Sequence, residues 1–141
     1  MADNELERIR RKKAKRLMEK AQTTQSNKKV KNIVKINSMQ EYQNLIKQYP
    51  EKIMVLDFWA EWCAPCKTFG PIFKKLSKEF QEEFIFGKVN IDQNQQLAAQ
   101  FQISSIPSTI FVKEGKIIKK LVGAVGYQNL KSIFHKLKEK N

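Results

Sequence analysis

A long apolar run closely followed by two cysteines constrains the fold of this chain more than any other feature. Residues 53–60 read Ile-Met-Val-Leu-Asp-Phe-Trp-Ala, a pattern typical of a central strand covered on both faces. Cys63 and Cys66 follow this run and are the only cysteines in 141 residues. Two thiols at this spacing can close a very small ring, which stabilises a fold by roughly 2 kcal/mol, against ~3 kcal/mol for a 15-residue loop. A disulfide between these cysteines would therefore add little stability but would form and break easily, which indicates dithiol–disulfide redox chemistry.

Composition limits the classes of protein to consider. With 41% hydrophobic residues the chain can bury one sizeable core, so we expect one domain and an appendage, as a monomer. A single cysteine pair excludes a disulfide scaffold, and no apolar run is long enough to predict a transmembrane helix. The first 20 residues are charged and lack the apolar stretch of a secretory signal. We therefore expect a cytoplasmic location, where a C-x-x-C motif serves redox or metal chemistry.

Positive charge is concentrated at the start of the chain. Residues 1–31 carry eleven basic and four acidic side chains, a net charge of +7, and the remaining 110 residues carry a net charge of +6. Residues 1–21 are rich in good helix formers and contain no Gly or Pro, so a basic helix is predicted there, followed by a polar linker. We divide the chain into a basic helical extension with its linker, residues 1–30, and a globular domain, residues 31–141.

Beyond the extension, hydrophobic periodicity predicts alternating strands and helices. Ser38 and Glu41 suit a capping box at the start of a helix, and Glu114-Gly115 marks a hairpin. Strands are predicted at residues 30–36, 53–60, 84–91, 109–112 and 116–122, and helices at residues 39–48, 64–80, 95–101 and 127–138. This order predicts an α/β fold, in which a mixed sheet of about five strands has helices on both faces.

The segment Val-Leu-Asp-Phe-Trp-Ala-Glu-Trp-Cys-Ala-Pro-Cys-Lys, residues 55–67, resembles the active-site signature of the thioredoxin family. The similarity extends over roughly residues 33–140 and includes Pro71, Lys88-Val-Asn-Ile-Asp92, Ile106-Pro107 and Val122-Gly-Ala124. The resemblance implies the thioredoxin fold and a protein-disulfide reductase without a cofactor of its own. Its partners would be disulfide-containing client proteins and, as electron donor, a flavin-dependent thioredoxin reductase.

The two cysteines are expected to divide the reaction between them. Cys63 precedes a predicted helix, where free backbone N–H groups and the positive end of the helix dipole favour a thiolate. Its pKa should fall from ~8.5 toward ~7, the value already known for thioredoxins. Cys63 is therefore the predicted nucleophile, and Cys66, one turn further and more buried, is the predicted resolving thiol.

Three other interpretations of the cysteine pair compete with a reductase. Half of a zinc site is one, but zinc needs four ligands and only His135, far along the chain, remains as a ligand of the usual kind. We therefore predict no metal. A redox-inactive binding or chaperone module with this fold is the main alternative. An oxidase or isomerase of a secretory compartment is disfavoured by the absent export signal and the single pair.

Asp57 is an acid within the apolar run, and burial of its charge is costly, so its pKa should be raised. The resemblance implies that Asp57 lies beneath the cysteine pair and takes the proton of Cys66. It also implies that Lys88 points toward Asp57 and moderates the shift. Without the resemblance, Asp57 could be a strand-end acid bonded to the backbone, and Lys88 a solvated lysine.

Residues around the cysteines are expected to contact the substrate. The resemblance implies a cis Ile106–Pro107 bond that places the Ile106 backbone beside the sulfurs, while Pro65 restricts Ala64 between the cysteines. Ala64, Ser104-Ser105 and Ser108 depart from the usual family residues and bear on redox potential and partner choice. The predicted substrate-binding residues are Trp62, Ala64, Pro65, Ile106, Pro107, Gly123 and Ala124.

The basic extension has two interpretations. One is a solvated helix, and the other is an electrostatic tether to a polyanion such as nucleic acid, the ribosome or an anionic membrane. Its first ten residues loosely resemble the start of small archaeal DNA-binding proteins, and basic helical extensions occur on some archaeal thioredoxins. Residues 1–31 contain no aromatic side chain for base stacking, so base-specific recognition is not expected.

Overall fold

The structure is a computed structural model that describes residues 33–140. The predicted basic helix, its linker and the first residues of the first predicted strand lie outside the described residues. The strands are β1 (Val34–Lys35), β2 (Ile53–Trp59), β3 (Phe84–Asn90), β4 (Ser108–Lys113) and β5 (Lys116–Val122). The helices are α2 (Met39–Gln48), α3 (Ala64–Glu79), α4 (Gln95–Gln100) and α5 (Tyr127–Lys140).

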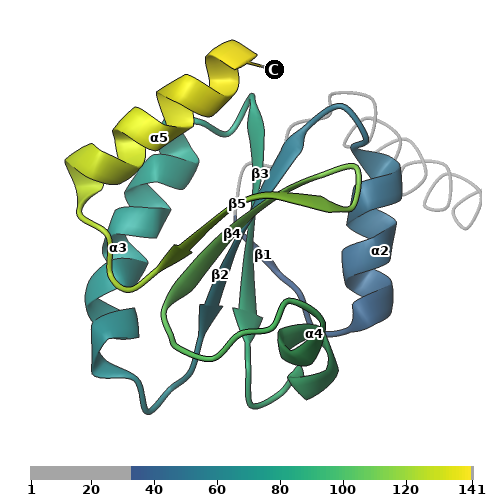
Figure 1. Ribbon diagram of the computed structural model, residues 1–141, viewed down its shortest axis with the longest axis vertical. Helices are drawn as coiled ribbons and strands as arrows, with labels where there is room; N and C mark the ends of the chain where they lie inside the picture. The colour runs from purple at the N-terminus through teal and green to yellow at the C-terminus, as the bar shows by residue number, and fades with distance from the viewer. Residues whose placement is uncertain (1–32, 141) are drawn as a thin grey trace, which may run out of the picture.

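The strands form one mixed sheet in the order β1-β3-β2-β4-β5. β1, β3 and β2 are parallel, whereas β4 and β5 run antiparallel to their neighbours. Helices α3 and α5 lie on one side of the sheet, and α2 and α4 lie on the other (Figure 1). The predicted α/β order and the mixed sheet with helices on both faces are confirmed.

Local sequence explains where several elements begin and turn. Ser38 Oγ accepts from the backbone N–H of Glu41 at 3.1 Å, as the capping box predicts, while the Glu41 carboxylate accepts from the N–H of Asn37. Glu114 and Gly115 both have positive φ, of 52° and 81°, which suits the tight turn between β4 and β5. Observed ends differ from the predicted ones by one or two residues in most elements.

Alternation along β2 divides the core into two parts. Met54, Leu56 and Phe58 pack on the α2 and α4 side, and Ile53 and Val55 pack on the α3 and α5 side. The second part is strongly aromatic and centres on Phe134 of α5, which contacts four other rings, those of Phe80, Phe84, Phe86 and Phe111.

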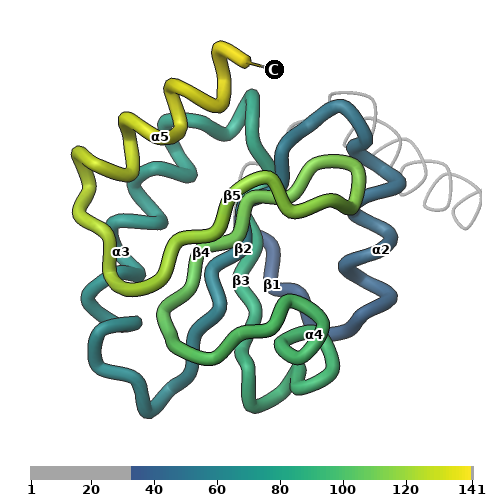
Figure 2. Tube along the Cα trace, in the orientation of Figure 1, coloured from purple at the N-terminus to yellow at the C-terminus, as the bar shows by residue number. Residues whose placement is uncertain are grey.

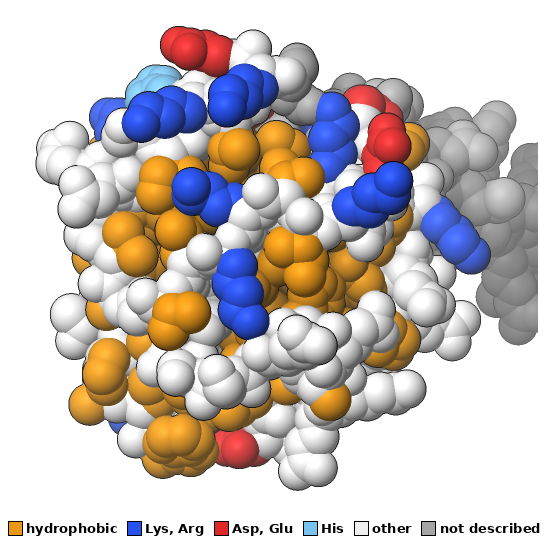
Figure 3. Space-filling view, viewed as in Figure 1, with side chains coloured by type: hydrophobic (Ala, Val, Ile, Leu, Met, Phe, Trp, Pro, Cys, Tyr) orange, Lys and Arg blue, Asp and Glu red, His pale blue; other side chains and the backbone are white. Residues whose placement is uncertain are grey.

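The loops after β2 and β3 and the loop before β4 meet at the same end of the sheet, at the lower edge of Figure 2. This is the carboxyl end of the parallel strands, where ligands commonly bind to α/β sheets. Elsewhere, β5 is an edge strand that exposes Ile117, Ile118 and Val122 and also carries Lys116, Lys119 and Lys120. Hydrophobic and basic side chains lie side by side on the face of the molecule that Figure 3 shows. Within the described range, none of the helices has the length and apolar character that crossing a membrane requires.

Candidate active site

Cys63 and Cys66 are joined in a disulfide at the start of α3, with their Cα atoms 5.3 Å apart. Cys63 is the N-cap residue of the helix, and the backbone N–H of Cys66 donates to Cys63 Sγ at 3.2 Å. Because the first N–H groups of a helix have no partner within it and the helix dipole is positive here, this position favours negative charge. After reduction, the same geometry stabilises a thiolate on Cys63.

Access, rather than burial, separates the two sulfurs. Cys66 is predicted to be the more buried of the two, and the exposed fractions of Cys63 and Cys66 are nearly equal, at 4% and 3%. A groove of about 430 Å³ at this end of the sheet is lined by Cys63 but not by Cys66. The complete lining is Trp62, Cys63, Ala64, Pro65, Ile91, Ile103, Ser104, Ser105 and Ile106. A substrate in this groove therefore reaches Cys63 first.

Asp57 lies in β2 and is completely buried. It follows Ile53 and Val55 by the strand period of two, so its side chain is on the sheet face that α3 covers. Both carboxyl oxygens lack a hydrogen-bond partner in the structure. Burial raises the pKa of Asp57 from 3.8 to about 7, and the positive charge of Lys88 acts in the opposite direction. A carboxyl with this pKa can accept a proton and release it again near neutral pH.

Lys88 is half-buried in β3 and lies directly opposite Asp57 in the parallel register. Its Nζ lies 4.8 Å from the centre of the Trp59 ring, which itself packs against the cysteines. Lys88 thus acts on Asp57 through Coulomb attraction while its ammonium is held over an aromatic face. The resemblance implied that Lys88 moderates the pKa of Asp57, and its Coulomb attraction acts in that direction.

The loop before β4 lies against the disulfide. The Ile106–Pro107 bond is cis, as the resemblance implied, and the carbonyl oxygen of Ile106 is 3.8 Å from Cys63 Sγ. The N–H of Gly123 donates to the carbonyl of Pro107 at 2.8 Å, which places the end of β5 next to this loop. Gly123 has φ of +98°, a conformation that other residues rarely adopt. Gly123 and Ala124, which were predicted to bind the substrate, are not among the residues that line the groove.

Several groove residues were not among the predicted contacts. Ile91, Ile103, Ser104 and Ser105 line the groove, although the two serines had been noted only as departures from the family pattern. Asp92 also takes part, since its carboxylate accepts from Trp62 Nε1–H at 2.9 Å and holds a ring that is 69% exposed. Ile91 and Asp92 lie within a motif that the sequence analysis identified, and the serines precede the Ile106–Pro107 motif, but only the fold brings the two loops together.

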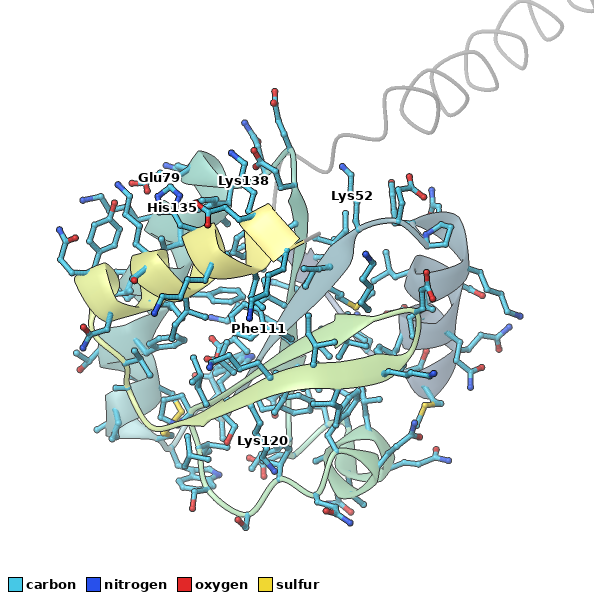
Figure 4. All side chains as sticks on the ribbon, turned by 45° about the horizontal axis from the view of Figure 1, so that its top comes forward. Lys52, Glu79, Phe111, Lys120, His135 and Lys138 are labelled. Carbon is cyan, nitrogen blue, oxygen red and sulfur yellow. A yellow bond between two sulfur atoms is a disulfide. The ribbon has the colours of Figure 1, made fainter. Side chains whose placement is uncertain are left out.

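His135 is remote from the thiols. It packs on the ring of Phe80 at 5.1 Å, on the outer part of α5 (Figure 4). Phe80 closes α3 at its C-terminal end, whereas the cysteines are at its start, and a 16-residue helix is about 24 Å long. In the described part of the chain, no three potential metal ligands gather at one place.

Comparisons with known proteins agree with one another. A family model described as thioredoxin matches residues 32–136. Thioredoxin-1 of Caenorhabditis elegans is 40% identical over 85 residues, which cover 60% of this chain and 73% of that protein. The thioredoxin of Buchnera aphidicola is 36% identical over 94 residues, covering 64% and 86%. The structure of Malassezia sympodialis thioredoxin (Mala s 13) matches with a TM-score of 0.71 and 31% identity, covering 78% of this chain and 94% of that one.

Proposed function

The chain belongs to the thioredoxin family and is a thiol–disulfide oxidoreductase, and we propose that it reduces protein disulfides through its Cys63-Ala-Pro-Cys66 motif. The observation that carries this proposal is the position of Cys63. It is the cysteine of the pair that lines the groove, and it caps a helix whose first N–H groups favour a thiolate.

The reaction consists of two exchanges. The Cys63 thiolate attacks one sulfur of a client disulfide, forming a mixed disulfide and releasing the other client sulfur as a thiolate. Cys66 then loses its proton to Asp57 and attacks Cys63 Sγ. The mixed disulfide breaks, the client leaves with both sulfurs reduced, and the protein keeps the Cys63–Cys66 disulfide. Two electrons have moved to the client, and the bond that remains is the one present in the structure.

The groove supplies the binding surface for an extended client segment. Trp62 and Ile106 give it apolar walls beside the sulfur, and the carbonyl of Ile106 is a hydrogen-bond acceptor close to Cys63. Members of the family generally act on disulfide substrates and are reduced by thioredoxin reductase. We propose the same donor for this protein, with no cofactor bound to the chain itself.

Serine variants of the two cysteines should fail at different steps, and this difference tests the mechanism. Cys63→Ser should abolish the protein's acceleration of insulin reduction by dithiothreitol, measured as turbidity, because no thiolate reaches the groove. Cys66→Ser should complete the first exchange only and accumulate a mixed disulfide, visible by non-reducing electrophoresis and mass spectrometry. Full multiple turnover by Cys66→Ser would contradict the two-step mechanism. No acceleration by the native protein would favour the redox-inactive binding or chaperone module.

We further propose that residues 1–31 act as an electrostatic tether, on the strength of their net charge of +7. Binding to a polyanion should then weaken steeply with salt. The test is retention on heparin between 50 mM and 500 mM salt, for the full chain and for a chain that starts at residue 32. Equal retention of both would contradict a tether. A cytoplasmic location and a monomeric state remain predictions for fractionation and size-exclusion measurements.

A further inference from the structure

A row of four side chains crosses the sheet beneath α3 at the level of Asp57. In the strand register, Asp57 lies between Lys88 of β3 and Thr109 of β4, and Thr109 lies opposite Leu121 of β5. Directly paired residues of antiparallel strands point to the same face, with Cβ atoms about 5 Å apart. Thr109 therefore stands beside Asp57 on the face that α3 covers.

Thr109 and Asp57 share an unusual condition. Each residue is 0% exposed, and Thr109 Oγ1 and both carboxyl oxygens of Asp57 have no hydrogen-bond partner in the structure. Buried polar groups are nearly always hydrogen-bonded, because an unmade bond carries the full cost of desolvation. Because Asp57 and Thr109 are directly paired on neighbouring strands, each can supply the hydrogen bond that the other lacks. One rotation about χ1 of Thr109, or one internal water between the groups, would satisfy both.

We propose that Thr109 is a positioning residue for the proton acceptor: its hydroxyl binds the Asp57 carboxyl, directly or through one water, and sets the pH at which that carboxyl takes up a proton. The proposal rests on the proposed function insofar as Asp57 serves Cys66. A hydroxyl suits this role because it donates to a carboxylate and accepts from a carboxylic acid. The bond to the charged form is the stronger one. Thr109 should therefore hold the pKa of Asp57 below the value that burial alone would give.

Groups from the neighbouring strands and from α3 also face the region of Asp57. Lys88 is the charged group on β3, and the cysteines lie at the start of α3, while β5 contributes the apolar Leu121. Thr109 is thus an uncharged group on β4 that can shift the pKa of Asp57.

The experiment is a titration of the Asp57 carboxyl carbon by NMR in the oxidised full-length protein. The resonance is assigned by its loss in Asp57→Asn. Thr109→Val keeps the shape of the side chain and removes the hydroxyl, so the midpoint should rise by about one pH unit. Thr109→Ser restores the hydroxyl and should return the midpoint to within a few tenths of the native value.

Ser108→Ala is the matched control. Its hydroxyl donates to the carbonyl of Ser105 at 2.5 Å, and strand alternation directs it to the other face of the sheet, so its loss should leave the midpoint unchanged. If Thr109→Val does not fold, Thr109→Ala removes the same hydroxyl with less demand on packing. An identical midpoint in the native, Val or Ala, and Ser proteins would overturn the proposal.

Failure of the proposed function gives a different result. If Asp57→Asn resolved mixed disulfides at the native rate, Asp57 would not be the proton acceptor, yet the shift in Thr109→Val would still stand. Conversely, turnover that depends on Asp57 without any shift in Thr109→Val would leave the reductase mechanism intact and remove Thr109 from it.

Discussion

Two neighbouring rows on the same sheet face are built in opposite ways. The hydrophobic row consists of Phe86, Val55 and Phe111, which pair across β3, β2 and β4. The polar row lies one strand period further along and consists of Lys88, Asp57 and Thr109 on the same three strands. Both rows lie on the face that α3 and α5 cover, yet the first is filled with packed rings and the second contains unpartnered oxygens.

The difference shows where stability and chemistry reside in this fold. Phe111, labelled in Figure 4, packs edge-on against Phe134 at 5.2 Å, and Phe86 stacks on the same ring at 5.4 Å. The buried side chains of the hydrophobic row therefore stabilise the fold through close packing. The polar row gains little from its burial, because a charged Asp57 is poorly solvated there. That unfavourable solvation raises the pKa of Asp57 to about 7 and makes it a useful proton acceptor.

The largest effect is expected in the hydrophobic row. Phe111→Ala removes a fully buried ring from the aromatic cluster and should lower the free energy of unfolding by about 3–5 kcal/mol. No titratable group is changed, so the loss should be the same at pH 5 and pH 8. Urea denaturation of the oxidised protein, followed by circular dichroism, measures it.

Ile117→Ala is the control for Phe111, since it deletes apolar atoms from a residue of the neighbouring strand that is 48% exposed. Its cost should be about 1 kcal/mol or less. A loss in Phe111→Ala that changed strongly with pH would break the contrast, because it would mean that the two rows act as one unit.

Sequence alone predicted the hydrophobic row better than the polar row. The apolar run of residues 53–60 and the phenylalanines of residues 84–86 identify buried strands, because burial on both faces leaves a continuous apolar pattern. Asp57 stood out within that run for the same reason. The resemblance supplied Lys88, and the parallel register confirms that it lies opposite Asp57.

Thr109 and the groove could not be predicted in this way. Nothing local marks Thr109, whose neighbour Asp57 is 52 positions earlier and is set by the antiparallel register of β2 and β4. Ser104, Ser105 and Ile91 likewise meet only because two loops converge at one end of the sheet. The N-cap role of Cys63 was predictable, since it depends on residues adjacent in the chain.

In the polar row, a substitution is expected to change the free energy of unfolding in a way that depends on pH. The pKa of Asp57 is about 7 in the folded protein, above its ordinary value of 3.8, so the folded state binds a proton more tightly than the unfolded state. Stability contributed by such a group is unaffected below pH 4 and falls as the pH rises toward 7. Asp57→Asn removes this dependence. Its stability relative to the native protein should therefore increase by up to about 4 kcal/mol between pH 4 and pH 8.5.

Comparison of the two proteins over the whole pH range isolates Asp57, because the other titrating groups are common to both and cancel. Asn nearly matches the shape of Asp, so the packing of the row is kept, and any constant offset reports the cost of the buried amide rather than the charge. The slope of the difference against pH is the decisive quantity. A flat difference would mean that the Asp57 carboxylate is well solvated or paired in solution, and the polar row would then differ from the hydrophobic row in composition but not in energetics.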